Sequence, residues 1–338
     1  MVRTGSRKSG VKRVYTVYES RHVVCCELIA DTSHLLPPSS LSRLARQWLL
    51  EDSPQLDWAG TVVGERPVGA TLLLKSPGVL AGSPFAQAVF REAGCRFRWL
   101  RRNGEDLEPV CTVACVWGPA RALLLAERAA LNVLAWASGV ATSCRSAQEL
   151  ARSLGCSGRL AGTRKTSPGF RLVGKHAMAV GGVETHRYGL GNLLMLKDNH
   201  LVVVGDIAKA VREARMIASV CNKIEVESRS LEEARQAALA GAGIVMLDNF
   251  TPQGVQEAAR ALRKEFPRLL IEASGGITQE NLPLYLSPHV YVISLGSFTQ
   301  QLTALDFSMK VLPELGSEPE SGSSPAPDPS LGPSDFSF

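Results

Sequence analysis

The chain has 338 residues, of which 45% are hydrophobic and 20% are charged, and its formal net charge is +5. This length and composition are typical of a globular protein with a large core, built as two domains or as one domain with an accessory. The most apolar stretch, residues 120–141, is interrupted by charged side chains. It falls short of the roughly 18 uninterrupted apolar residues of a membrane helix, so we expect no membrane partner. The basic excess is small and scattered, which argues against a nucleic-acid partner and favours a small anionic ligand.

The two ends of the chain carry opposite charge. Residues 1–22 contain six Lys or Arg against one Glu, whereas residues 311–338 contain five acidic residues and no basic one. We interpret residues 1–33 as a basic extension, disordered or targeting-like, and residues 311–338 as a disordered acidic tail. The eight cysteines form no CxxC pair. We therefore expect reduced thiols in a cytoplasmic protein rather than a zinc site.

Mixed helix and strand patterns between the basic extension and residue 127 predict an N-terminal α+β domain over residues 34–127. Apolar residues recur at helical spacing behind Ser and Pro start signals, and β-branched and aromatic runs flank a turn dipeptide. The expected elements are helices at 37–52, 83–94 and 119–139, and two strands within 95–118 around a turn at Asn103-Gly104.

From residue 158 onward, short apolar segments alternate with helical ones. Continuous apolar strands joined by helices predict a parallel sheet, because parallel strands need crossover connections and are buried on both faces. We assign this sheet to a second domain, residues 128–310, whose last helix is expected to pack back on the N-terminal domain. The six expected strands lie within 159–165, 193–200, 223–228, 243–250, 268–278 and 290–297.

Polar residues stand at the end of every one of these six strands. In (β/α) barrels the active site is formed by the C-terminal strand ends and the loops that follow them. An open doubly wound sheet would instead use mainly the strands beside its switch point, so polar ends on six strands favour a barrel. The strand-end groups are Arg164-Lys165, Lys197-Asp198-Asn199, Glu227, Asp248-Asn249, Glu272 to Gly276, and Ser294 to Gly296.

The cations of this set predict an anion pocket. It comprises Arg164, Lys165 and Lys197, with His186 and Arg187 from a loop between the first two strands. The planar fork of arginine suits carboxylates and phosphates, while lysine supplies a movable point charge.

Carboxylates and small residues complete the expected site. Glu227 and Asp248 end neighbouring strands, where they could hold Mg²⁺ bound to a polyphosphate or accept hydrogen bonds from sugar hydroxyls. The Ser-Gly-Gly and Ser-Leu-Gly ends of the last two strands offer backbone N–H groups to a phosphate.

Each signal also has a simpler structural explanation when taken alone. Arg164 and Lys165 could end a strand in solvent, Asp248 could cap the next helix, and His186 could be a hydrogen-bonded structural residue. A different enzyme class is also open, an aldolase-type barrel in which Lys197 forms a Schiff base. The occurrence of all these groups at one edge of one predicted barrel favours an anion-handling active site.

A series of motifs over residues 35–310 resembles those of the quinolinate phosphoribosyltransferases, the nicotinate-nucleotide pyrophosphorylases, in their animal form. The motifs are KSPGVLAG (75–82), ER..LN (127–132), SG (138–139), GTRKTSPGFR (162–171), HRYGLG (186–191), KDNH (197–200), EVE (225–227), LDNF (247–250) and EASGGIT (272–278).

The resemblance implies an N-terminal α+β domain followed by an incomplete, seven-stranded α/β barrel. Only six strands are evident, so we expect the seventh near residues 130–160 or after Ser297. The implied reaction transfers ribose 5-phosphate from phosphoribosyl pyrophosphate to quinolinate and releases pyrophosphate and CO₂. The implied cofactor is Mg²⁺, with no organic cofactor. A catalytically inactive quinolinate-binding homologue remains an alternative.

The resemblance also assigns roles to residues. Lys165, Lys197, Glu227 and Asp248 are the implied catalytic residues, and Glu227 and Asp248 also bind ribose hydroxyls and Mg²⁺. The implied ligands of quinolinate and pyrophosphate are Arg128, Arg164, Lys165, Thr166, His186, Arg187 and Lys197. The implied ligands of the 5-phosphate are Ser274, Gly275, Gly276 and Gly296.

Three further expectations follow from the resemblance. The family forms dimers or hexamers in which an arginine like Arg128 reaches the neighbouring subunit's site. Gly189 stands where family members commonly have an acidic residue, and that difference could loosen the pocket around Arg187. We expect Arg164 to bind a quinolinate carboxylate, Lys165 to reach the pyrophosphate, and Arg171 to be only structural.

Overall fold

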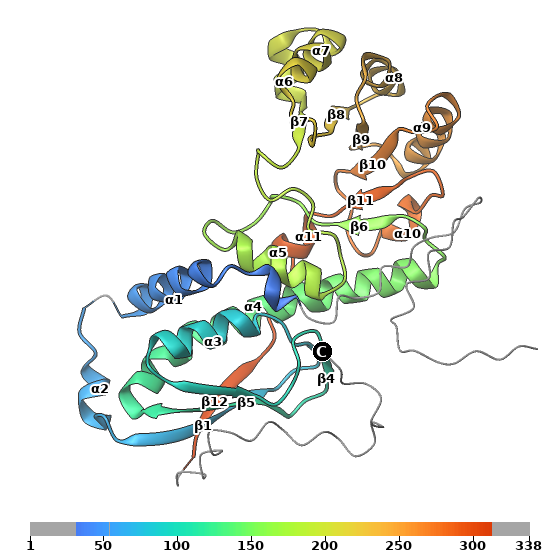
Figure 1. The fold of residues 1–338 in the computed structure, drawn as a ribbon. Coiled ribbons are helices and arrows are strands. Elements are labelled where there is room, and N and C mark those ends of the chain that lie inside the picture. Colours follow the sequence, from blue (N-terminus) through green and yellow to red (C-terminus); the bar gives the residue numbers. More distant parts are fainter. Residues whose placement is uncertain (1–31, 54, 313–338) are drawn as a thin grey trace, which may run out of the picture.

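The computed structural model describes residues 32–312 except residue 54 (Figure 1). The basic extension and the acidic tail predicted for the two ends lie almost entirely outside the described residues. The described chain forms an antiparallel sheet and a parallel sheet, with one long helix between them.

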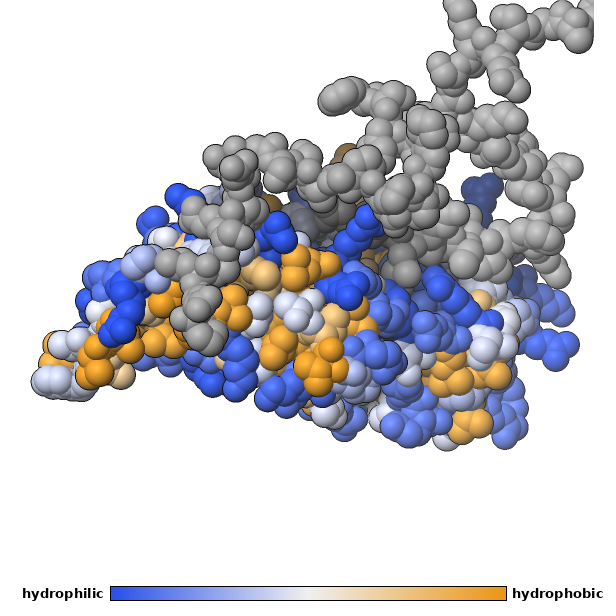
Figure 2. All heavy atoms as spheres, turned by 90° about the horizontal axis from the view of Figure 1, so that it is seen from below, coloured by the Kyte–Doolittle hydropathy of each residue, from blue (hydrophilic) through white to orange (hydrophobic). Residues whose placement is uncertain are grey.

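The N-terminal domain is an antiparallel sheet with helices packed on it, as its mixed pattern predicted. The strands lie in the order β12-β1-β5-β3, and α3 buries apolar residues such as Phe85, Val89 and Phe90. The elements are η1 (Ser33–Leu35), α1 (Pro38–Asp52), α2 (Trp58–Val63), α3 (Ser83–Glu92), β1 (Pro67–Leu74), β3 (Arg96–Trp99), β5 (Cys111–Pro119) and β12 (Phe307–Val311). The face of the molecule that is seen from below in Figure 2 has small groups of hydrophobic residues between hydrophilic ones.

The expected pair of strands within 95–118 is confirmed, but Asn103-Gly104 does not form a simple two-residue turn. β3 pairs with β5, and their connection contains β4 (Asp106–Leu107), which pairs with β2 (Gly78–Val79). The Asn103 side chain accepts a hydrogen bond from the Ser83 hydroxyl at 2.6 Å, and the Gly104 N–H bonds the Leu80 carbonyl at 2.7 Å. These contacts fasten the connection to the start of α3.

Helix α4 (Ala120–Ser153) continues well beyond the predicted end at residue 139. It contributes Leu134 to the core of the N-terminal domain and Val140 to the core of the second domain, so the expected boundary at 127/128 falls inside a helix. By length and composition α4 could cross a membrane, but 61% of its most apolar 18-residue window is buried inside the protein. That burial is typical of a core helix.

The second domain has a sheet of six parallel strands in the order β6-β11-β10-β9-β8-β7, with helices outside it. All five residues of β8 are buried, including the polar residues Glu225, Glu227 and Ser228, so both faces of this strand are covered. The strands are β6 (Arg159–Ala161), β7 (Leu194–Leu196), β8 (Ile224–Ser228), β9 (Ile244–Asp248), β10 (Leu270–Ser274) and β11 (Val292–Ser294). The helices are α5 (Arg171–Val180), α6 (Asp198–Val204), α7 (Ile207–Ile217), α8 (Leu231–Ala240), α9 (Pro252–Glu265), α10 (Leu282–Tyr285) and α11 (Ser297–Gln300).

The seventh strand position lies in neither of the two expected places. Residues 130–153 are helical, and the strand that follows Ser297, β12, belongs to the other sheet. A single parallel bridge joins Ala161 of β6 to Glu184, which places Glu184 between β6 and β7 in the barrel order. A single bridged residue does not form a run of apolar residues, so the sequence pattern did not reveal this strand position.

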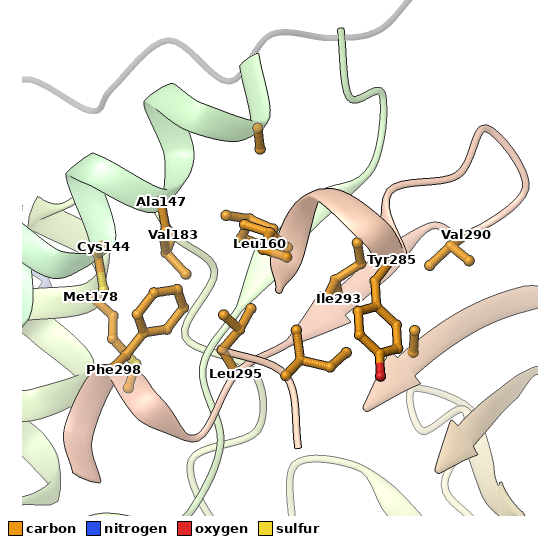
Figure 3. Close-up of a cluster of buried hydrophobic side chains, with 14 of the residues drawn as sticks. Cys144, Ala147, Leu160, Met178, Val183, Tyr285, Val290, Ile293, Leu295 and Phe298 are labelled. Atoms are coloured by element: carbon orange, nitrogen blue, oxygen red, sulfur yellow. The ribbon is translucent and has the colours of Figure 1, made fainter. Parts of the chain in front are cut away.

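The element that packs back on the N-terminal domain is a strand rather than the expected last helix. β12 pairs antiparallel with β1, from Phe307 opposite Leu74 to Val311 opposite Ala70. The short helix before it, α11, stays with the barrel, where Phe298 packs against Met178 of α5 and Cys144 of α4 (Figure 3).

Candidate active site

The C-terminal ends of the parallel strands form one continuous rim. Asp248 at the end of β9 lies opposite Ser274 on β10, and Ser294 at the end of β11 lies opposite Ala161 on β6. The Ser294 hydroxyl donates to the Ser274 hydroxyl at 2.9 Å. The structure therefore brings the predicted strand-end residues together.

Lys197 and Glu227 form an ion pair at this rim. Lys197 is the N-cap of α6, and its ammonium group contacts a carboxylate oxygen of Glu227 on the adjacent β8. Burial raises the pKa of Glu227, Lys197 lowers it, and nearby Asp248 and Asp198 raise it further. The lysine therefore opposes the effect of burial on a carboxyl group that is only 7% exposed.

Several cationic side chains lie close to the Lys197–Glu227 pair, and they are not all paired with carboxylates. Arg164 is half-buried, and its Nε has no hydrogen-bond partner among the described residues. Burial lowers the pKa of Arg187, Arg164 lowers it further, and the rim glutamates oppose the shift. Lys175 on α5 is 3% exposed, and burial together with Arg171, Arg164 and Arg187 lowers its pKa to about 8. Such a group of cations is suited to binding a polyanion.

His186 is fixed between the backbone and a buried carboxyl pair. Its Nδ1 accepts the Arg187 backbone N–H at 2.8 Å, so its Nε2 carries the proton that faces Glu272 at 3.0 Å. Glu225 is fully buried behind Glu272, and burial together with Glu272 raises the pKa of Glu225 to about 9. Ligand atoms of His186, Glu225 and Glu272 lie within 4.8 Å of one another, a second place besides Glu227 and Asp248 that could hold a cation.

Small residues shape the opposite part of the rim. Gly275 has φ 94°, and a Cβ there would lie 2.6 Å from the Asn249 backbone nitrogen, so only glycine fits. At Gly296 a Cβ would approach the Lys165 side chain at 3.1 Å, which places Lys165 over the end of β11. Gly276 has φ 64° with open space beside it. These loops leave backbone accessible to a phosphate group.

Comparisons with known proteins agree with this geometry. The family model "Quinolinate phosphoribosyl transferase, N-terminal domain" matches residues 57–138, and the corresponding C-terminal domain model matches residues 140–310. The chain belongs to the quinolinate phosphoribosyltransferase family. Together the two models cover both sheets and the entire rim.

Named relatives and solved structures are similar over most of the chain. The chain is 53% identical to the nicotinate-nucleotide pyrophosphorylase [carboxylating] of Rattus norvegicus over 280 residues, covering 83% of this chain and 94% of that protein. It is 52% identical to the Homo sapiens protein of the same name over 277 residues, covering 82% and 93%. Its structure matches the nicotinate-nucleotide pyrophosphorylase of Francisella tularensis with a TM-score of 0.76, 32% identity, and coverage of 83% and 99%.

Thr166 and Arg128 are two further residues that the family resemblance implies as ligands of the substrates. Thr166 accepts a hydrogen bond from Arg171 Nε at 3.1 Å, so it contacts a cation of α5. Arg128 is exposed on α4 and makes no hydrogen bond or ion pair among residues 32–53 and 55–312. It is not joined to the rim of its own subunit.

Gly189 has room for the acidic side chain common in quinolinate phosphoribosyltransferases. A Cβ at this position would meet only the Asn192 side-chain oxygen, at 3.9 Å. That oxygen accepts the Gly189 N–H at 2.9 Å, so Asn192 holds the turn in this chain.

Two buried residues of the site, Lys175 and Glu225, were given no role from the sequence. Glu225 lies two residues before Glu227 in the EVE motif (225–227), so the alternation of side chains along a strand already places it on the face of Glu227. Lys175 lies inside a helix, and no local signal distinguishes a lysine that points inward.

Proposed function

We propose that the chain transfers ribose 5-phosphate from phosphoribosyl pyrophosphate to quinolinate, giving nicotinate mononucleotide, pyrophosphate and CO₂. The observation that carries this assignment is the single rim at which a half-buried cation cluster faces carboxylates and glycine-rich strand ends. Quinolinate brings two carboxylates and its co-substrate brings several phosphate charges, so their joint binding requires such a cluster.

The residues divide between the two substrates. Arg164 and Arg187 bind the quinolinate carboxylates, and Lys165 and Lys197 face the pyrophosphate. Both ring nitrogens of His186 have protein partners, so His186 contributes to the quinolinate pocket by holding the Arg187 backbone. Glu227 and Asp248 accept hydrogen bonds from the ribose hydroxyls. Ser274, Gly275, Gly276 and Gly296 bind the 5-phosphate through hydroxyl and backbone N–H groups.

The chemistry needs no enzyme nucleophile. The quinolinate ring nitrogen bonds to C1 of ribose as the bond to pyrophosphate breaks, and positive charge develops on the sugar. Glu227 and Asp248 stabilise that charge, and the lysines stabilise the leaving group. The alkylated ring nitrogen then accepts electrons, so the adjacent carboxylate leaves as CO₂ and a proton takes its place on the ring carbon.

We propose Mg²⁺ as the metal ion. Carboxylate oxygens of Glu227 and Asp248 are the ligand type that this hard cation prefers. Lys197 already pairs with Glu227, which favours an ion held mainly by the pyrophosphate oxygens. When bound, Mg²⁺ would neutralise charge on the leaving group.

A label test decides between this function and its alternatives. With Mg²⁺ and phosphoribosyl pyrophosphate, quinolinate labelled with ¹⁴C in the carboxyl next to the ring nitrogen should release ¹⁴CO₂ in step with nicotinate mononucleotide. Label in the other carboxyl should remain in the product, and omission of Mg²⁺ should suppress both. Quinolinate binding without turnover would indicate an inactive homologue. Borohydride trapping of a phosphorylated sugar on Lys197 would instead support the alternative hypothesis of a Schiff-base aldolase.

We also propose that the enzyme assembles as dimers or as hexamers of dimers, with Arg128 completing the neighbouring site. The isolation of Arg128 from its own rim supports this arrangement. We place the enzyme in the cytoplasm, in keeping with the free thiols of the cysteines in the described part of the chain.

Mixing two impaired variants tests the exchange of Arg128. Arg128→Ala and Glu227→Gln should each retain only a small fraction of the wild-type activity alone. After dissociation and reassembly together, roughly a quarter of the wild-type activity should return, because half of the dimers are mixed and each contains one complete site. No recovery, with mixed dimers demonstrated by differently tagged subunits, would place Arg128 in its own subunit's site.

A further inference from the structure

A four-residue turn, Thr185–Tyr188, carries His186 and Arg187, and one face of α5 holds both of its ends. The Lys175 ammonium group donates to the Thr185 carbonyl oxygen. Arg171 Nη1 donates to the Tyr188 carbonyl oxygen at 3.1 Å. Arg171 and Lys175 are one helical turn apart, so their side chains leave the same face of α5.

The turn needs such support because its conformation is unfavourable. His186 has φ 55°, in the left-handed region that side chains other than glycine seldom adopt. On the other side of the turn, the imidazole is fixed by Glu272 at 3.0 Å and by the Arg187 N–H at 2.8 Å. The direction of the Arg187 side chain therefore depends on contacts at both sides of this strained residue.

Arg171 extends the support to the neighbouring loop. Its Nε donates to the Thr166 hydroxyl at 3.1 Å, and its guanidinium group lies 6.0 Å from the centre of the Tyr188 ring. Thr166 belongs to the loop that presents Arg164 and Lys165. One side chain thus connects the two loops that supply the quinolinate-binding arginines.

The two cations of α5 that hold the turn, Lys175 and Arg171, have no carboxylate partner within the described chain. Lys175 is 3% exposed, and the charged groups that face it are the guanidinium groups of Arg171, Arg164 and Arg187. Neither Lys175 nor Arg171 forms an ion pair with a carboxylate among the described residues. Buried cations require an opposite charge, and a bound dicarboxylate supplies two.

We propose that Arg171 and Lys175 are positioning residues for quinolinate, a two-point clamp on the Thr185–Tyr188 turn that the bound dicarboxylate stabilises. The clamp rests on the proposed quinolinate activity. Binding and clamping favour each other, because the anion compensates the two cations and the cations hold His186 and Arg187 in place for the anion.

The test compares Lys175→Met and Arg171→Gln with wild type and with Lys209→Met, a change at an exposed lysine that pairs with Glu213 on α7. Each clamp variant should raise the KM for quinolinate roughly 10- to 100-fold, the loss expected for a charged hydrogen bond. The KM for phosphoribosyl pyrophosphate should change less than about threefold. Arg171→Lys keeps the charge but not the fork, so it should restore part of the quinolinate affinity. Lys209→Met should resemble wild type.

Thermal unfolding separates positioning from a merely structural role. Without ligand, Lys175→Met should differ little in stability from wild type, because removal of a buried uncompensated charge offsets the loss of its hydrogen bond to Thr185. The rise in Tm that quinolinate gives wild type should shrink in this variant. A variant that loses stability without ligand, or whose two KM values rise together, would overturn the clamp. Clamp variants with the kinetics of the wild type would also overturn it. An inactive wild-type protein would instead refute the proposed function.

Discussion

Replacing Lys197 with methionine is expected to lower kcat/KM by about 10²- to 10³-fold, because two groups fail together. The ammonium group that faces the leaving pyrophosphate is lost. Glu227 also loses the cation that opposes the effects of burial, Asp248 and Asp198 on its pKa. With its pKa raised further, a smaller fraction of Glu227 is ionised at a given pH, so the residue stabilises positive charge on the ribose less well.

A double-mutant cycle with Glu227→Gln provides the measurement. If the lysine acts partly through the glutamate, the double variant should be only slightly worse than the poorer single variant. The acid limb of the pH–rate profile should also move to higher pH in Lys197→Met, since activity requires the ionised carboxylate and its pKa has risen. Lys223→Met, at an exposed position before β8, is the matched control. Additive losses and an unmoved acid limb would show that the two residues act independently.

The rim of the site could be predicted from sequence because its signals are local. Lys197 and Asp248 come at the ends of apolar runs, Glu227 ends a strand in which acidic and apolar residues alternate, and parallel strands end on the same side of a barrel. That reasoning needs only the strand-helix alternation, and the structure places these residues at the C-terminal ends of β7, β8 and β9.

The residues that hold the rim in place could not be predicted, because their partners are distant in sequence. Glu225 meets Glu272 across β9, a contact that depends on the register of three strands. Lys175 reaches Thr185 only because α5 turns one particular face toward the sheet. Arg171 was expected to be only structural, since nothing in its helix indicates that it spans two loops.

The two domains were predicted, but the strand that returns to the first of them was missed for a similar reason. β12 returns to β1 after more than half of the chain, and pairing at that separation leaves no local pattern. A last helix was expected to pack back on the N-terminal domain, because nothing in the sequence around residues 307–311 indicates a strand of the other sheet.

Arg164→Ala should weaken quinolinate binding by roughly 30- to 1000-fold and phosphoribosyl pyrophosphate binding by less than about threefold. The Nε of Arg164 is buried without a partner among the described residues, so the guanidinium group is free to donate two hydrogen bonds to a carboxylate. Calorimetric titration of each substrate gives the two affinities separately.

Lysine and a distant arginine supply the controls for Arg164. Arg164→Lys keeps a charge but offers no planar fork, so its quinolinate affinity should lie between those of the wild type and the alanine variant. Arg260→Ala, at an exposed position on α9, should bind both substrates like wild type. Equal losses for quinolinate and phosphoribosyl pyrophosphate in Arg164→Ala would reassign this arginine to the pyrophosphate. The quinolinate carboxylates would then be bound by Arg187 and by Arg128, which we propose reaches the site from the neighbouring subunit.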